Sequence, residues 1–306
     1  MFLNDEAQPY KPSFLRLLFG WQRSFTLFIL IAGVIICLLE SYGILTEKHQ
    51  FPSFPLGVIG GALGIFVSFR TNSCYQRWWE GRKLWGRLIN TSRHICSQAV
   101  TYLPTERAIK VVHRHIVYVH VLRLSLRGNS PIKDQHYLRC YDQDEHEELS
   151  GSANLNHALL THQLKEFKTA YDAKEINEFW LSDLDESVRH LLDIQGGSER
   201  IKKTPFPPAY GFLALQLTKL YAVLFPLCVV YELGWWTVIV NLLLCMTFQL
   251  INEVGRVLEN PFSSYWPALP LNAMCLTIER DLRFALSEPL PDSEPVIKAK
   301  GVSVLM

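Results

Sequence analysis

The chain has 306 residues, of which 49% are hydrophobic and only 19% are charged, and its formal net charge is +1. This composition is apolar for a soluble protein of this size and too charged for one confined to lipid, so it predicts a mixture of membrane and aqueous parts. A net charge near zero provides no overall field to recruit nucleic acid. The seven cysteines are scattered without a C-x-x-C pair, which indicates free thiols and not a disulfide framework.

Four apolar runs approach or exceed the roughly 20 residues that a helix needs to cross a bilayer core. They cover residues 25–39, 51–69, 204–231 and 233–252. The first run follows a long polar and basic segment without a small-residue cleavage site, so we expect it to remain in the protein and not act as a signal peptide. The sequence therefore predicts four membrane-spanning helices.

Two charged residues belong to these runs, where an unpaired charge costs a few kcal/mol or more. Glu40 ends the first run and Lys219 interrupts the third. Each could line a cavity inside the protein or extend toward the membrane surface. The position of Glu40 favours the surface, whereas Lys219 is closer to the middle of its run.

Basic residues flank the spans unevenly. Cations precede the first span, follow the second, precede the third and follow the fourth, whereas the connection between the first two offers only Lys48. Because cytoplasmic loops carry the excess of Lys and Arg, both termini and the long middle segment are expected in the cytoplasm. The predicted organisation is spans one and two in 1–70, a cytosolic helical region in 71–203, spans three and four in 204–255, and a cytosolic C-terminal helix and tail in 256–306.

Helical periodicity dominates the segments outside the spans. Residues 107–126 and 176–194 repeat apolar side chains every three or four positions, and residues 271–286 are amphipathic. The pair Gly196 and Gly197 interrupts the second of these patterns. The last twenty residues, with three prolines and no periodicity, are expected to lack regular structure.

No motif for an enzyme is present. The sequence has no Walker loop, no G-x-S-x-G, no H-E-x-x-H and no nucleophile–base arrangement. His113, His115 and His120 are the densest histidine group, but none pairs with a cysteine or carboxylate at an established metal spacing, which favours solvated or interfacial histidines over a metal site. We therefore expect no catalytic residue, no cofactor and no metal.

The second apolar run carries two rows of small residues. Gly57, Gly61, Ile65 and Phe69 follow one another every four positions and form a stripe along one side of a helix, with Gly60 and Gly64 in a neighbouring row. Small residues at this spacing allow close helix packing in lipid. A narrow apolar stripe repeated around a symmetry axis could instead form a hydrophobic constriction in a channel. One row can pack while the other lines a pore.

Three separated stretches resemble the bestrophin family, and in particular its bacterial branch. They are FRTNSCYQRWWEGRKLWGRLIN from Phe69, QGGSERIKKTPFPPAY from Gln195 and LENPFSSYWPALPLNAMCLTIERDL from Leu258, and they occur in the family's order. The resemblance implies an all-α membrane protein with four transmembrane helices and a large cytosolic helical region, assembled as a homopentamer around a central pore.

The resemblance also implies site residues. Counted from Arg77, Trp78 and Trp79, the three positions of the family's pore neck fall on Gly61, Ile65 and Phe69, with glycine where relatives usually carry a branched residue. The cytosolic aperture falls on Phe179, and Ile176 is the alternative register. Arg77 and Glu80 are expected to act structurally, with Trp78 and Trp79 at an interface.

Gating and selectivity are less constrained. Animal bestrophins hold Ca²⁺ with a cluster of acidic residues, whereas this chain has no carboxylate between Glu259 and Glu279, so no calcium clasp is expected. The resemblance implies a channel for small inorganic ions in a bacterial inner membrane, in contact with lipid and with further copies of itself. Chloride is favoured, and a monovalent cation channel, a solute transporter and a non-conducting scaffold are the alternatives.

Overall fold

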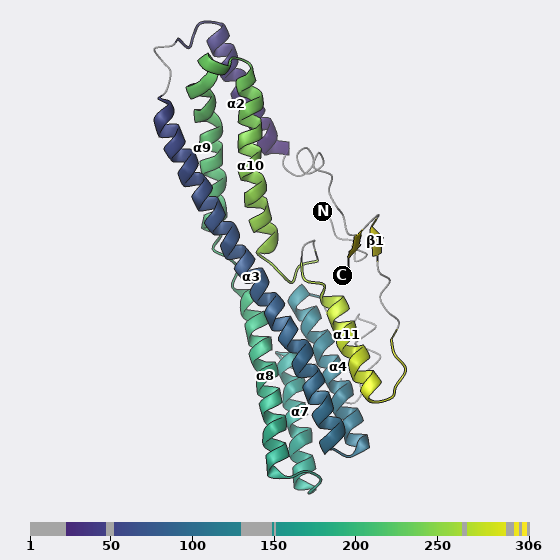
Figure 1. The fold of residues 1–306 in the computed structure, drawn as a ribbon. Coiled ribbons are helices and arrows are strands. Elements are labelled where there is room, and N and C mark those ends of the chain that lie inside the picture. Colours follow the sequence, from purple (N-terminus) through teal and green to yellow (C-terminus); the bar gives the residue numbers. More distant parts are fainter. Residues whose placement is uncertain are drawn as a thin grey trace. The chain divides into compact units, whose positions relative to one another are not determined.

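The computed structural model describes residues 23–46, 52–129, 149, 151–264, 268–291, 297–299 and 302–304, and these are predominantly helical (Figure 1). The helices are α2 (Arg23–Ser41), α3 (Ser53–Tyr102), α4 (Thr105–Arg127), α7 (Leu155–Asp172), α8 (Glu178–Lys203), α9 (Pro208–Leu233), α10 (Trp236–Leu258) and α11 (Leu271–Ala285). The prediction of a helical protein is therefore confirmed for the described residues.

One short element departs from that prediction. Strands β1 (Ile297–Ala299) and β2 (Val302–Val304) pair antiparallel, with Ile297 opposite Val304. The expectation that this end of the chain lacks regular structure is wrong for these six residues. Ile297, Val302 and Val304 are β-branched residue types, which favour an extended backbone, and helical periodicity does not include this local signal.

Four candidate membrane spans are found in the described chain, as the sequence predicts. By length and hydropathy they fall within Arg23–Ser41, Phe54–Tyr102, Glu178–Leu233 and Trp236–Leu258. The apolar runs of the sequence occupy α2, the first half of α3, α9 and α10 in that order. Helices are expected here, because a backbone in lipid must satisfy its hydrogen bonds internally.

The described residues form two compact units. Residues 23–78 and 205–259 make one, which we call the membrane unit, and residues 79–204 and 260–304 make the other, which we call the bundle unit. The continuous helix α3 contributes its first half to the membrane unit and its second half to the bundle unit.

In the membrane unit, α2, α9 and α10 pack together, and the first half of α3 joins their core (Figure 1). Helix α9 contains Pro226, which has no N–H to donate to the carbonyl of Ala222. The side-chain amide of Asn241 in α10 donates to that carbonyl instead, at 2.9 Å. A buried polar side chain thus satisfies the backbone group that the proline leaves without its helical partner.

In the bundle unit, α4, α7, α8 and α11 surround a core to which the second half of α3 contributes. Trp85 of α3, Tyr118 of α4 and Phe167 of α7 are fully buried. The predicted helices over 107–126, 176–194 and 271–286 correspond to α4, α8 and α11.

Gly196 and Gly197 interrupt the sequence pattern but not the helix, because α8 continues to Lys203. A Cβ on Gly197 would lie 2.9 Å from the side chain of Leu84 in α3. The glycine therefore permits a close approach between two helices.

Candidate functional site: the α3 face and its polar junction

The first half of α3 presents its two small-residue rows to different surroundings. A Cβ on Gly60 would lie 3.0 Å from the ring of Tyr221, and one on Gly64 would lie 3.8 Å from the ring of Phe248. A Cβ on Gly61 would meet no heavy atom within 4 Å. The Gly60 row thus packs within the chain, and the Gly61 row does not.

Large apolar side chains follow Gly61 on this open face. Ile65 is 62% exposed and Phe69 is 69% exposed, whereas Leu63 and Val67, on the other side of the helix, are buried in the core of the membrane unit. Apolar side chains of this size are costly to leave in water. The open face of α3 is therefore suited to contact lipid or another copy, or to line a narrow apolar passage.

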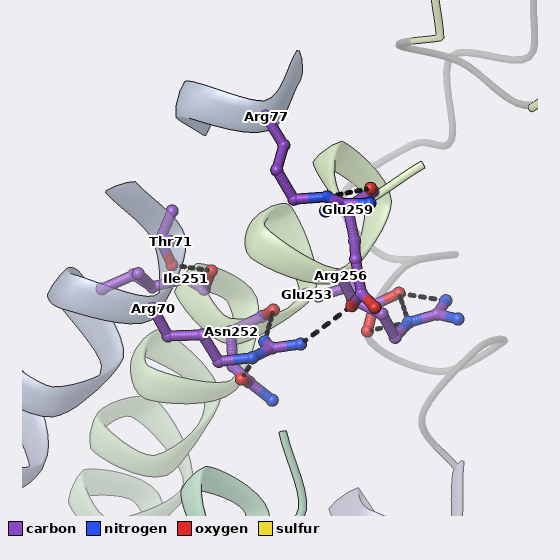
Figure 2. Close-up of polar contacts among 8 residues, drawn as sticks. All are labelled: Arg70, Thr71, Arg77, Ile251, Asn252, Glu253, Arg256 and Glu259. Carbon is purple, nitrogen blue, oxygen red and sulfur yellow. Dashed lines mark hydrogen bonds and ion pairs between the residues drawn. The ribbon is translucent and has the colours of Figure 1, made fainter. Parts of the chain in front are cut away.

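The polarity of α3 changes immediately after Phe69. Arg70 is only 5% exposed, and its Nη1 donates to the backbone carbonyl of Asn252 at 2.9 Å and to Oδ1 of the same residue at 2.6 Å (Figure 2). Its Nη2 lies 3.6 Å from Oε2 of Glu259. The guanidinium of Arg70 is therefore directed toward Asn252 and Glu259.

Further contacts join α3 to the end of α10. The hydroxyl of Thr71 donates to the carbonyl of Ile251 at 3.1 Å, and Nε of Arg77 donates to the carbonyl of Glu259 at 3.2 Å (Figure 2). Arg256 pairs with Glu253 one turn earlier on α10. We call Arg70, Thr71, Arg77 and their α10 partners the polar junction.

The remaining residues of the R-W-W-E motif have distinct positions. Trp78 stacks with Tyr75 at a centroid distance of 6.2 Å, and Trp79 is partly exposed. Glu80 forms an ion pair with Lys83 at 2.9 Å. The structural role expected for Arg77 and Glu80 is compatible with these contacts and stays a prediction.

The two aperture candidates differ sharply in exposure. Phe179, in the first turn of α8, is 85% exposed, whereas Ile176 is buried before that helix begins. The side chain of Asn177 caps α8 by accepting a hydrogen bond from the N–H of Trp180. Trp180 stacks on Tyr102 with ring centroids 4.8 Å apart. Phe179 is therefore open to another copy or to a passage, and Ile176 is not.

The three histidines of α4 have separate partners. His115 is buried against the hydroxyl of Ser92, and burial lowers its pKa to about 3. His113 contacts Glu288 at 2.7 Å, and His120 contacts Glu279 at 3.0 Å. In the described ranges no three potential metal ligands come together.

Glu279 is the centre of a buried ionic chain that the sequence did not reveal. It accepts from Arg283 at 2.9 Å in addition to contacting His120, and Arg283 also donates to Glu288. Although burial opposes ionisation, the hydrogen bonds and electrostatic interactions with His120 and Arg283 lower the pKa of Glu279 to about 2. Glu279 belongs to the T-I-E-R-D-L stretch, but its partner on α4, His120, lies 159 residues earlier in the chain, so no local pattern predicts the contact.

The charges in the apolar runs do not pair with one another. Glu40 in α2 and Lys219 in α9 are both partly exposed, and no ion pair joins them in the described chain.

The partners of Arg70, which are Asn252 and Glu259, were not identified from the sequence, although Glu259 belongs to the E-N-P-F stretch. A carboxylate after an apolar helix was the only available signal.

Four candidate membrane helices, an exposed apolar face on one of them and a helical bundle unit are features of an integral membrane protein. The family described as Bacterial/Fungal Bestrophin protein matches residues 11–284. The chain belongs to the bestrophin family.

Individual relatives agree with this membership. The chain is 30% identical to the voltage-dependent anion channel-forming protein YneE of Salmonella typhi, over 88% of this chain and 90% of that protein. It is 31% identical to the voltage-dependent anion channel-forming protein alr2987 of a Nostoc species, over 82% of each. A crystal structure of a bacterial bestrophin homologue from Klebsiella pneumoniae is similar with a TM-score of 0.80 and 26% identity, over 86% of this chain and 98% of that one. The expectation of an ion channel and not an enzyme agrees with this family.

Proposed function

We propose that this chain is one subunit of a homopentameric channel that conducts small monovalent anions, chloride above all. The main support for this proposal is the open apolar face of α3, on which Ile65 and Phe69 are exposed in the single chain. Five such faces around one axis would form a hydrophobic neck that controls the wetting of the pore. The names of the relatives favour anions over cations.

In this proposal Gly61, Ile65 and Phe69 form three successive rings of the neck. Gly61 has no side chain and an open surrounding, so its ring is the widest, and Ile65 and Phe69 form the barrier. Phe179 forms a second ring at the cytosolic aperture. The exposure of Phe179 and the burial of Ile176 favour this register.

The proposed channel lies in a bacterial inner membrane, with both termini and the bundle unit in the cytoplasm and lipid around the outer faces of the spans. The distribution of Lys and Arg supports this orientation. Gating does not involve a calcium clasp, because the E-N-P-F stretch is followed by no carboxylate before Glu279 and Ca²⁺ requires several hard oxygen ligands.

The test is the reversal potential of purified protein in a planar bilayer that separates unequal NaCl concentrations. We expect a value near the chloride equilibrium potential, and a value near that of sodium would replace the anion channel by a cation channel. A non-conducting scaffold would be supported if verified pentamers of the unaltered protein carry no current and pentamers of the Ile65→Ala, Phe69→Ala double variant carry none either. Native mass spectrometry of the same sample tests the number of subunits.

The neck is tested separately by the permeability of methanesulfonate relative to chloride. Removing the barrier in the Phe69→Ala variant is expected to raise this ratio, because a wider and wetter constriction discriminates less by size. A ratio equal to that of the unaltered channel would exclude Phe69 from the neck.

A further inference from the structure

The end of the open α3 face coincides with a buried arginine. Phe69 and Arg70 are adjacent, and successive helical residues point about 100° apart. Phe69 therefore projects from the open face, while Arg70 projects into the membrane unit, where it is 5% exposed. The side chain that would line the neck and the side chain that enters the protein share one stretch of backbone.

The Arg70 guanidinium is held by both the main chain and the side chain of one residue. Its Nη1 donates to the carbonyl and to Oδ1 of Asn252, and its Nη2 approaches Glu259 (Figure 2). Asn252 is itself buried. The planar guanidinium, with several fixed donors, suits this arrangement, whereas a lysine has only one nitrogen to offer.

Two glycines leave room for the guanidinium. A Cβ on Gly211 of α9 would lie 3.2 Å from Nη2 of Arg70, and a Cβ on Gly255 of α10 would lie 3.4 Å from Nη1 and 3.3 Å from Cα of Thr71. Helices α9 and α10 thus approach the arginine where neither has a side chain. The surroundings of Arg70 are enclosed on several sides, so a change in its contacts must move a helix or leave a buried charge without its partners.

Phe69 has no comparable support of its own, because most of its surface is open in the chain. Its position is set by the α3 backbone, and Arg70 fixes that backbone at the next residue. We propose that Arg70 is a positioning residue of the neck, which holds the Phe69 ring in place through Asn252 and Glu259 of the membrane unit. This inference rests on the proposed channel function.

A second role for Arg70 would be to attract anions by its charge. Burial and the adjacent Glu259 carboxylate oppose this role, because the positive charge is compensated inside the protein. The two roles predict different measurements. A positioning residue alters discrimination by size through Phe69, whereas a charge in the permeation path alters the chloride-to-sodium permeability ratio.

The experiment compares Arg70→Gln in the unaltered channel and in the Phe69→Ala channel, with verified pentamers in planar bilayers. In the unaltered background we expect the methanesulfonate-to-chloride permeability ratio to rise about fivefold, the change equivalent to a hydrogen bond of about 1 kcal/mol. In the Phe69→Ala background the same substitution should change the ratio less than about twofold, because the side chain through which Arg70 acts is absent. The exposed arginine of the same helix, in Arg82→Gln, is the matched control and should leave the ratio unchanged.

Two outcomes would overturn the inference. One is an equal effect of Arg70→Gln in both backgrounds, and the other is a change confined to the chloride-to-sodium ratio. If Phe69→Ala itself leaves size discrimination unchanged, the proposed neck is wrong. This result differs from a failure of the inference on Arg70, because the Phe69→Ala variant retains Arg70.

If Arg70→Gln does not assemble, Asn252→Ala and Arg70→Lys replace it, because both retain the charge and weaken the contacts. Each is then expected to raise the ratio in the unaltered background and not in the Phe69→Ala background. Pentamers of both variants with unaltered discrimination would overturn the inference.

Discussion

The membrane unit and the bundle unit accommodate buried polar groups in different ways. In the membrane unit, Arg70 meets Asn252 and Glu259 near one end of α10, while most other contacts are apolar and include the glycine row of α3. In the bundle unit a chain of polar contacts joins His120 and His113 of α4 to Glu279 and Arg283 of α11 and to Glu288, which follows that helix. Lipid offers no partner to a polar group, so polar contacts concentrate where they can be completed inside the protein.

Similar helices are held by different forces in the two units. Helices in lipid gain little from the hydrophobic effect against one another and depend on close packing. Helices in water gain from apolar burial, and buried charges between them must be paired. Substitutions that remove a charge should therefore be most damaging in the bundle unit, and substitutions that add a methyl group should be damaging at the packed row of the membrane unit.

The largest expected effect is that of Glu279→Gln. The variant leaves His120 and Arg283 without their buried carboxylate and is expected to destabilise the bundle unit by about 3–5 kcal/mol, measured by thermal unfolding. The matched control on the same helix is Asp281→Asn, which breaks an exposed ion pair with Arg93 and should cost less than about 1 kcal/mol. Equal losses in the two variants would contradict a special role for the buried chain.

The acid dependence of stability should follow the same carboxylate. The pKa of Glu279 is lowered from 4.5 to about 2 in the folded protein, so its ionised form stabilises the fold above pH 4.5, and this contribution is lost as the pH falls from 4.5 toward about 2. By linkage the shift corresponds to about 3 kcal/mol. As the pH falls across this range, the thermal unfolding midpoint should fall less steeply in the Glu279→Gln variant than in the unaltered protein. Identical slopes in the two proteins would show that Glu279 does not cause the loss of stability in acid.

The next effect compares two adjacent glycines of α3. Gly60→Ala places a methyl group against Tyr221 and is expected to destabilise the membrane unit by about 1–3 kcal/mol. Gly61→Ala meets no neighbouring atom and should retain stability while altering conductance. Thermal unfolding in detergent and single-channel recording distinguish the two. A comparable loss of stability at both positions would contradict the assignment of one packed and one open row.

The smallest effect concerns the start of α8. Trp180→Ala removes the ring that stacks on Tyr102 and should destabilise the bundle unit by about 1 kcal/mol beyond the loss of buried area. Its neighbour Phe179 is largely exposed, so Phe179→Ala should alter permeation with little change in the unfolding temperature. A larger loss of stability in Phe179→Ala than in Trp180→Ala would indicate that Phe179 is packed and not open.

The helical class, the four candidate spans and the resemblance to bestrophins could be predicted from the sequence, because each depends on signals among residues close together in the chain. Apolar run length and helical periodicity are properties of neighbouring residues. Spacing also identified the stripe of Gly57, Gly61, Ile65 and Phe69, but it did not show that this side of the helix is open. The short β1–β2 pair was missed because its signal is only three residues long on each side. Gly196 and Gly197 were taken as an interruption of the helix, because glycine occurs both at helix ends and where two helices pack closely.

Three features depend on contacts between distant parts of the chain. They are which small-residue row packs, which aperture candidate is exposed, and toward which residues Arg70 points. Gly60 and Gly61 are chemically identical neighbours, and the difference between them arises from Tyr221, about 160 residues later. Arg70 and Asn252 are separated by 182 residues, and Glu259 lies seven residues beyond Asn252. No local pattern encodes such a pairing, because the contacts form only when α3, α9 and α10 pack together.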